Sequence, residues 1–361
     1  MNYHNRCSRC LLPDNYPGIE FNDANICNYC VAYDRRKVRE NGFLKNRYRA
    51  WMEKIIEKTK KENKSNYDCL LCYGGGKDST YLLYLLTEEY KLNVLAYTFD
   101  NEFMSEAAKR NIQRTLRKIN VDHVWYRPEE GFWNKLYSAA FKDILTNRSS
   151  ELCPQHVCSQ CSRVTDFYAN KIAMENDIPL LFYGLSPHQL WVPKLVLPKY
   201  GVVLSYLVNK LLYSLGIRQR FSCTLDDKEQ KELRIPLWGL RKVPYLITPF
   251  YALGYDIPKI KETVFKMDLI APGDEHPLSS NCLLNYLMID LDYRRFRYNP
   301  YLQEFSQLVR EGNLNRREWL LLFEQVDQKI EEGTWERDKI DSVLKKLGLT
   351  SCYQEYIAKL K

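Results

Sequence analysis

A glycine-rich stretch at residues 72–80, Cys-Tyr-Gly-Gly-Gly-Lys-Asp-Ser-Thr, holds the residue types of a phosphate-binding turn. Three consecutive glycines let the backbone adopt positive φ angles and approach a ligand closely. Apolar runs flank the stretch, which predicts a strand, a turn and a helix. The N–H groups of the turn and of the helix N-terminus then converge where an anion is favoured. Lys77 adds a positive charge there, and Ser79 adds a hydroxyl donor.

The stretch departs from the Walker A pattern, because an aspartate separates Lys77 from Ser79. It resembles instead the SGGxDS pyrophosphate loop of the N-type ATP pyrophosphatases, also called PP-loop enzymes. Gly74 stands where that family has serine, so one hydroxyl contact to pyrophosphate is missing. The resemblance implies that ATP is split to AMP and pyrophosphate with Mg²⁺ bridging the phosphates, and that Lys77, Asp78 and Ser79 are catalytic. It implies an ATP-binding set of Gly74, Gly75, Gly76, Lys77, Asp78 and Ser79. The alternatives are a turn without a ligand and a nucleotide-binding regulator without turnover.

Strands and helices alternate after the glycine-rich stretch. Strands are predicted at 67–71, 92–99, 122–126 and 178–184, and helices at 103–119 and 163–176. This alternation predicts an α/β fold, a doubly wound parallel sheet with helices on both faces. The resemblance makes this an adenine nucleotide alpha hydrolase-like (HUP-type) fold, with an N-terminal zinc ribbon and a C-terminal helical region added to it.

The resemblance also implies which residues contact the adenosine part of ATP. Parallel sheets bind ligands at the carboxyl ends of their strands. Phe99 and Asp100 end the second predicted strand, and Gly184, Ser186 and Gln189 follow the fourth. Many relatives carry an acidic residue in that last turn, whereas this chain has Ser-Pro-His-Gln, so a metal-binding role there is not expected.

Four cysteines near the N-terminus have the spacing of a structural zinc site. Two C-x-x-C pairs, separated by sixteen residues, supply Cys7, Cys10, Cys27 and Cys30. Four thiolates close a tetrahedral Zn²⁺ site, and the metal replaces the core that such a short segment lacks. A redox or iron–sulfur role is the alternative.

The same segment resembles the N-terminal ribbon of the N-acetyl sugar amidotransferases of surface-polysaccharide (lipopolysaccharide and O-antigen) biosynthesis. The resemblance covers Cys7–Pro13, Pro17–Phe21 and Ile26–Cys30, and residues 311–322 resemble the helical tail of those proteins. It implies that ammonia converts the N-acetyl group of a nucleotide sugar to an acetamidino group. The ammonia would come from a separate glutaminase subunit, since this chain has no recognisable glutaminase domain.

A second cysteine group suggests a different nucleophile. Cys158, Cys161 and Cys282 match the layout of thiolating PP-loop enzymes, which hold an iron–sulfur cluster on three thiolates. Cys153 and His156 are alternative ligands. The alternatives are structural thiols, a second zinc site, and iron–sulfur or persulfide chemistry. In the last case the enzyme would be a sulfurtransferase that makes a thioamide or a thiolated base, with RNA as a partner.

The net charge of +8 resides in one segment of the 361-residue chain. Residues 35–66 hold twelve Lys or Arg and four Glu, so the remainder is neutral overall. This basic helical arm could contact nucleic acid, an anionic substrate or a membrane. The alternative is a solvated helix that packs through Trp51, Ile55 and Ile56. Without an N-terminal apolar leader, the twelve cysteines are expected to be thiols or metal ligands in a cytoplasmic protein.

The expected organisation has five segments. They are a zinc ribbon (1–34), the basic arm (35–66), the ATP-binding core (67–192), an insertion that faces the substrate (193–275) and a helical region (276–361). From 200 to 217 the only charge is Lys210. This apolar stretch suits a membrane span, an interfacial or partner-binding helix, or a buried insertion. Interfacial attachment would give peripheral membrane contact.

Overall fold

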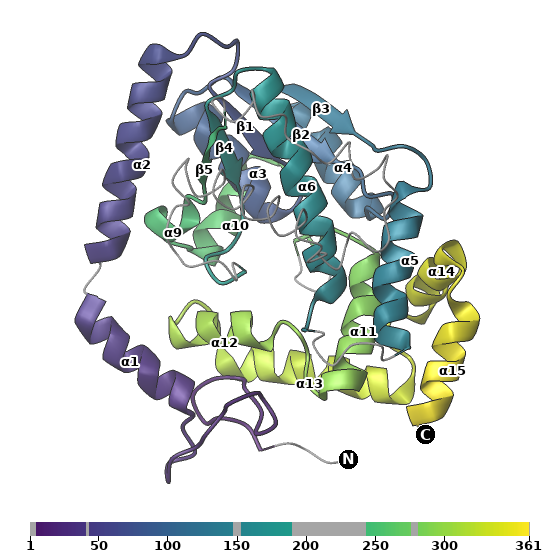
Figure 1. The fold of residues 1–361 in the computed structure, drawn as a ribbon. Coiled ribbons are helices and arrows are strands. Elements are labelled where there is room, and N and C mark those ends of the chain that lie inside the picture. Colours follow the sequence, from purple (N-terminus) through teal and green to yellow (C-terminus); the bar gives the residue numbers. More distant parts are fainter. Residues whose placement is uncertain (1–4, 41–42, 147–152, 190–242, 276–280, 361) are drawn as a thin grey trace, which may run out of the picture. The chain divides into compact units, whose positions relative to one another are not determined.

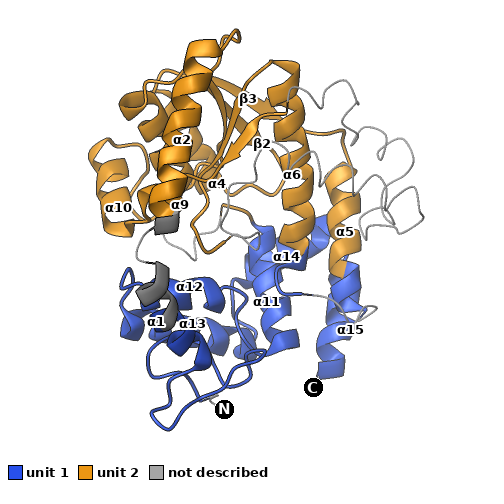
Figure 2. Ribbon diagram, turned by 60° about the vertical axis from the view of Figure 1, so that its left-hand side comes forward, with its two compact units in different colours: residues 1–44, 142–156, 283–361 blue, residues 45–141, 157–282 orange. Residues whose placement is uncertain are grey.

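The computed structural model describes residues 5–40, 43–146, 153–189, 243–275 and 281–360. They form two compact units, coloured separately in Figure 2. Unit 1 comprises 1–44, 142–156 and 283–361, and unit 2 comprises 45–141 and 157–282. The apolar stretch 200–217 and the first part of the expected insertion lie outside the described residues.

Unit 2 is built on five parallel strands in the order β3-β2-β1-β4-β5. They are β1 (Cys69–Cys72), β2 (Val94–Phe99), β3 (Asp122–Tyr126), β4 (Leu180–Tyr183) and β5 (Tyr245–Ile247). In β1, Cys72 lies opposite both Tyr97 and Tyr183, which makes β1 the central strand. The first four strands confirm the prediction. The fifth was missed, because three residues are too few to show a period.

Helices cover both faces of this sheet, as predicted. They are α2 (Phe43–Glu62), α3 (Lys77–Tyr84) with its continuation η1 (Leu85–Glu89), α4 (Glu106–Leu116), α5 (Phe132–Leu145), α6 (His156–Glu175), α9 (Phe250–Leu253) and α10 (Ile257–Lys266). In Figure 1, α6 lies in front of the sheet and α3 and α4 lie behind it. Side-chain contacts agree with this view. Tyr73 after β1 bonds Thr80 of α3, whereas the Phe99 ring packs against Tyr168 of α6.

Helix α2 carries much of the basic arm and buries one face. Tyr48, Met52 and Ile56 are buried at i, i+4 spacing, which is the periodicity of a helix face. The Tyr48 hydroxyl accepts a hydrogen bond from the backbone N–H of Thr248, at 3.1 Å, beside β5. Trp51 and Ile55, expected to form the apolar stripe, are only half-buried at its side.

Unit 1 combines the N-terminal cysteine segment and the helix α1 (Asn28–Glu40) with helices from the end of the chain. The latter are α11 (Leu284–Phe296), α12 (Leu302–Arg310), α13 (Arg316–Glu332), α14 (Arg337–Leu347) and α15 (Thr350–Leu360). Leu11 and Leu12 are fully buried against Leu302, Trp319 and Phe323, so the ribbon shares a core with α12 and α13. Among the described residues, no helix is long and apolar enough to cross a membrane.

Candidate functional site

The glycine-rich turn lies where the strand order of the sheet reverses. From β1 the chain proceeds outward to β2 and β3, and it then returns to the other side of β1 to form β4 and β5. Helices of the two halves diverge at such a point and leave a crevice beyond the carboxyl ends of the strands, where open α/β sheets bind ligands. Gly74 to Gly76 follow β1 there, and Gly184 follows β4.

At two positions of this site only glycine fits, because backbone atoms of a neighbouring helix lie where a side chain would be. Gly75 has φ of +73°, and a Cβ on it would lie 2.5 Å from the carbonyl oxygen of Ala108 in α4. A Cβ on Gly184 would lie 2.7 Å from the Cα of Ser79 in α3. The turn is therefore held between α4 and the end of β4. Gly74 differs, because nothing lies within 4 Å of where its Cβ would be.

The first turn of α3 follows directly on the glycine turn. Its N-cap residue is Gly76, so the N-cap position supplies no side-chain acceptor to the first N–H groups of the helix. The Ser79 hydroxyl donates to the Gly76 carbonyl at 3.2 Å. N–H groups at a helix N-terminus attract anions. The helix N-terminus lies where the phosphate cradle requires it, and anion binding there stays a prediction.

Lys77 and Asp78 form a closed group with a tyrosine that the sequence did not suggest. The Lys77 ammonium donates to the Asp78 carboxylate at 2.6 Å and to the Tyr255 hydroxyl at 3.0 Å. The Tyr255 hydroxyl donates in turn to the other Asp78 oxygen, at 3.0 Å. Tyr255 precedes α10, which packs against α3.

Asn281 and Cys282 bring a second distant segment to the turn. A Cβ on Gly76 would lie 2.5 Å from Nδ2 of Asn281, so this amide rests against the glycine turn. The Asn281 carbonyl accepts from the N–H of Ser105, the N-cap of α4, at 2.9 Å. Cys282 pairs with Met104 in an isolated bridge. Cys282 therefore follows directly after the residue that contacts Gly76, and its thiol lies against Asn101.

The thiols of the second cysteine group converge on two polar side chains. Asn101 Nδ2 donates to Cys282 Sγ at 3.1 Å, and the Tyr137 hydroxyl donates to Cys161 Sγ at 3.1 Å. The pKa of the Cys161 thiol is raised to about 12, mainly by burial and also by Cys282, while the hydrogen bond from Tyr137 opposes the shift. Cys158 lies one helical turn from Cys161 on α6 and also raises the pKa of Tyr137.

The start of α6 corrects one prediction. The helix was expected at 163–176, but it begins at His156, so Cys158 and Cys161 lie inside its first two turns. Cys153 is exposed, and His156 lies in unit 1, with Nε2 3.9 Å from an Asp143 oxygen. In the described parts of the chain, the N-terminal cysteines are the only group of three or more potential ligand residues whose ligand atoms all lie within 4.8 Å of one another.

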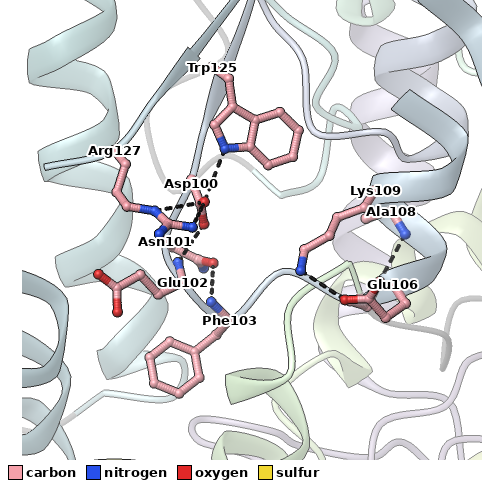
Figure 3. Close-up of polar contacts among 10 residues, drawn as sticks. Asp100, Asn101, Glu102, Phe103, Glu106, Ala108, Lys109, Trp125 and Arg127 are labelled. Atoms are coloured by element: carbon pink, nitrogen blue, oxygen red, sulfur yellow. Dashed lines mark hydrogen bonds and ion pairs between the residues drawn. The ribbon is translucent and has the colours of Figure 1, made fainter. Parts of the chain in front are cut away.

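Asp100 is buried at the end of β2 and is bonded to protein groups. Its carboxylate accepts from Trp125 Nε1 at 3.0 Å, from Arg127 Nε at 3.0 Å and from the Glu102 N–H at 2.7 Å. Figure 3 shows Trp125 and Arg127 both directed at it. Burial alone would raise the pKa of Asp100, but these donors outweigh burial and lower it. Asp100 therefore fixes the turn that presents Asn101 to Cys282.

The other predicted adenosine contacts lie at two places. Phe99 stands at the carboxyl end of β2 with its ring against Trp133 and Tyr168. Ser186 and Gln189 form a turn after β4, in which the Ser186 N–H donates to the Gln189 side chain and the Gln189 N–H to the Ser186 carbonyl, both at 3.2 Å. The structure thus brings Gly184 against the loop helix, and it holds Phe99 in an aromatic cluster beside β2.

The N-terminal cysteines have the geometry of a zinc ribbon. Cys7 and Cys30 Sγ atoms are 3.8 Å apart, Cys10 and Cys27 Sγ atoms are 3.7 Å apart, and all four residues are fully buried. Four sulfurs at about 2.3 Å from a tetrahedral Zn²⁺ would be about 3.8 Å apart. Residues 7–30 therefore fit this metal.

An arginine of α12 completes the surroundings of these thiols. Arg310 donates through Nε to Cys30 Sγ at 3.2 Å and through Nη2 to Cys10 Sγ at 3.3 Å. Arg316 donates to the carbonyls of Cys7 and Cys10. The positive charge of Arg310 offsets the negative charge of a tetrathiolate zinc site.

Sequence reasoning missed five side chains of these sites: Asn101, Tyr137, Tyr255, Asn281 and Arg310. No short motif identifies them, because their partners lie between 24 and 300 residues away along the chain. One usable signal was present. Asn281 directly precedes Cys282, which the cysteine spacing had singled out.

Comparisons with known proteins give a distant likeness. No family model matches the chain. An uncharacterized protein from Methanocaldococcus jannaschii is 33% identical over 113 residues, which is 31% of this chain and 36% of that relative. The chain therefore spans about a third of the length of this curated relative.

The solved structures that resemble the chain have low TM-scores and low sequence identity to it. The U34-tRNA thiolase NcsA from Methanococcus maripaludis, with its [4Fe-4S] cluster, has a TM-score of 0.31 and 18% identity over 75% of this chain and 78% of its own. NMN synthetase from Francisella tularensis has a TM-score of 0.33 and 10% identity over 88% and 96%. NH3-dependent NAD synthetase from Campylobacter jejuni has a TM-score of 0.27 and 16% identity over 38% and 58%.

Proposed function

We propose that this protein is an ATP-dependent enzyme that adenylates a carbonyl or amide oxygen and then transfers a nucleophile to the activated carbon. The observation that carries this proposal is the N-terminus of α3, which follows the glycine turn directly at the reversal point of the sheet. The preferred reaction transfers ammonia to the N-acetyl group of a nucleotide sugar in surface-polysaccharide biosynthesis. This assignment rests on the resemblance of the ribbon and the tail.

The reaction has two steps. The acetamido oxygen attacks the α-phosphorus of ATP, the α–β phosphoanhydride bond breaks, and pyrophosphate leaves with the bonding electrons. Ammonia then attacks the carbon of the O-adenylated imidate. The carbon–oxygen bond to AMP breaks, AMP leaves, and loss of a proton gives the acetamidino group. A separate glutaminase subunit would supply the ammonia.

The residues of the loop have distinct roles in this reaction. The N–H groups that follow Gly74 would bind the pyrophosphate portion, and Ser79 would donate its hydroxyl. Lys77 would neutralise the charge that develops as the α–β bond breaks. The Asp78 carboxylate offers the oxygen ligands that Mg²⁺ prefers. Catalysis would rest on position and charge, because these groups hold the ligand without forming a covalent bond to it.

Sulfur transfer is the second candidate, and one observation favours it. Cys282 and Cys161 converge on Asn101 and Tyr137, and Cys282 directly follows the residue that rests on the glycine turn. An iron–sulfur cluster would supply a sulfide when bound. The Sγ atoms of Cys158, Cys161 and Cys282 do not all lie within 4.8 Å of one another, as those of the N-terminal four do. This candidate therefore rests on the position of Cys282 next to Asn281, which contacts Gly76.

Metal and sulfide analysis of anaerobically purified protein separates the two candidates. Zinc without iron or labile sulfide supports ammonia transfer and contradicts cluster-dependent sulfur transfer. Turnover is then measured as AMP and pyrophosphate formed from ATP, an N-acetylated nucleotide sugar and ammonium. A Cys158→Ala/Cys161→Ala variant that keeps its fold and zinc should keep ammonia-dependent turnover. Loss of that turnover would contradict ammonia transfer.

A further inference from the structure

We infer that Tyr255 and Asn281, which follow residues 190–242 in the sequence, complete the ligand site of the glycine turn. Tyr255 is a positioning residue for Lys77 and Asp78, and Asn281 is a donor to a bound polyphosphate. This inference rests on the proposed function, because it assumes that the turn binds ATP. It goes beyond that function by assigning roles to residues outside the loop motif.

Tyr255 is held rigidly against the loop helix. Its side chain is buried, and its ring packs against Phe250 with centroids 5.7 Å apart. Gly254, with φ of +87°, turns the chain between α9 and α10 and so places Tyr255 beside α3. The rigid side chain therefore holds its hydroxyl in one position, where it bonds to both Lys77 and Asp78.

The Tyr255 hydroxyl bonds to both Lys77 and Asp78. It therefore lowers the free-energy cost of moving the Lys77 ammonium from Asp78 to a bound ligand. The side chains of Lys77 and Asp78 are 15% and 19% exposed, and their charges neutralise each other while they remain paired. A bound phosphate must draw the ammonium away from Asp78. Without Tyr255, that movement would leave a largely buried carboxylate without its partner, which is costly. With Tyr255, the carboxylate keeps a hydroxyl donor as the lysine turns.

Asn281 offers an amide donor on the opposite side of the turn. Its Nδ2 rests against Gly76, and its backbone is fixed by the hydrogen bond from Ser105 at the N-terminus of α4. A phosphate that accepts from the first N–H groups of α3 would come within reach of this amide. An amide N–H is a neutral donor, so it adds affinity without another charge.

Three variants test these roles against two matched controls. Asn281→Ala removes the donor, Asn281→Asp replaces it with a negative charge, and Tyr255→Phe removes only the hydroxyl. The controls are Asn176→Ala, an exposed asparagine at the end of α6, and Tyr84→Phe, at the end of α3 away from the turn. Binding of ATP with Mg²⁺ is measured by calorimetry, and turnover by AMP release.

Asn281→Ala is expected to weaken ATP binding about tenfold, and Asn281→Asp more strongly, because the carboxylate repels the phosphates. Tyr255→Phe is expected to lower kcat about tenfold with KM changed less than threefold. The two controls should match the wild type. Unchanged ATP binding in Asn281→Ala would overturn the role of Asn281, and a Tyr255→Phe variant that loses only thermal stability would overturn the role of Tyr255.

A double-mutant cycle tests the contact between Gly76 and Asn281 with pyrophosphate as the ligand. Gly76 has φ of −82°, so an added Cβ meets no backbone strain and clashes only with Asn281. Gly76→Ala should therefore displace the exposed Asn281 amide at little cost in stability, and it should weaken pyrophosphate binding more in the wild type than in an Asn281→Ala background. Equal weakening in the two backgrounds would overturn the role of Asn281. If the wild type binds neither ATP nor pyrophosphate, the proposed function fails and the ligand roles fail with it.

Discussion

At the scale of single residues, the glycines of the glycine turn and Gly184 after β4 have different surroundings. Gly75 and Gly184 face backbone atoms of α4 and α3 at distances that a side chain cannot occupy. Gly74 faces open space, although it stands where PP-loop enzymes carry serine. The first two are needed to form the site, whereas Gly74 is a position where a side chain can be added.

Gly184→Ala is expected to destabilise unit 2 by about 1–3 kcal/mol, because its Cβ would press on the Ser79 backbone, which cannot rotate away as a side chain could. Gly74→Ala is the matched control and should change the free energy of unfolding by less than about 0.5 kcal/mol. Urea denaturation followed by circular dichroism measures both. Equal effects of the two variants would contradict the close packing of β4 against α3.

Gly74→Ser is expected to tighten ATP binding about three- to tenfold, since a hydrogen bond contributes about 0.5–1.5 kcal/mol. Open space around the position lets the hydroxyl enter without displacing the loop. Titration calorimetry with ATP and Mg²⁺ provides the measurement, and Gly74→Ala separates the effect of the hydroxyl from that of the Cβ. No gain in affinity would show that the hydroxyl does not reach the phosphates.

At the scale of elements, the zinc ribbon depends on helices from the other end of the chain. Leu11 and Leu12 share a core with Trp319 and Phe323, and the Arg310 side chain donates to two of the four thiols. A metal site whose ligands accept outer hydrogen bonds releases its metal more slowly. The ribbon and helices α12 and α13 are therefore expected to gain stability together when zinc binds.

Arg310→Met is expected to release zinc about tenfold faster to a coloured chelator, because two thiolates lose their donors and the positive charge is removed. Arg9→Met is the control. Arg9 also lies in the ribbon, but its exposed guanidinium pairs with Asp34. Its bond to a thiol, that of Cys7 at 3.4 Å, comes from the backbone N–H, which the substitution keeps. Zinc release at equal rates from the two variants would contradict a role for Arg310 in retaining the metal.

At the scale of the whole molecule, each unit buries carboxyl groups whose ionisation opposes folding. Burial raises the pKa of Asp292 in unit 1 to about 7, against the lowering effects of the Gln155 N–H and Arg295. Burial likewise raises the pKa of Asp166 in unit 2 to about 6. Both carboxyls bind a proton more tightly when folded than when unfolded. Their contribution to stability is thus full below about pH 4 and is lost as the pH rises through the folded pKa.

Asp292→Asn is expected to remove the loss of folding stability that ionisation of Asp292 causes in unit 1 as the pH rises. The wild type should lose up to about 4 kcal/mol between pH 4 and pH 7 at this residue, while the amide does not ionise. The stability of the variant relative to the wild type should therefore increase with pH. Denaturation followed by tryptophan fluorescence at pH 4.5, 6 and 8 measures it, with the exposed Asp338→Asn as the control. A constant difference across that range would contradict the raised pKa.

Much of unit 2 could be predicted because its signals are local. The glycine turn, four strands and the alternation with helices are written in adjacent residues. The same holds for the two C-x-x-C pairs of unit 1. The first turns of α6 escaped prediction because Cys153 to Cys161 lack the apolar period of a helix. The strand β5 escaped because it has only three residues.

The sequence by itself determined the class of the fold, the glycine turn between β1 and α3 and the four-cysteine cluster, since each is written in residues that lie close together along the chain. Only the tertiary structure decided which side chains meet at these places. Tyr255 reaches Lys77 and Asn281 reaches Gly76 because α10 and the bridge at Cys282 fold back onto the loop helix. Such contacts depend on packing between distant segments, and the local spacing of residues carries no record of it.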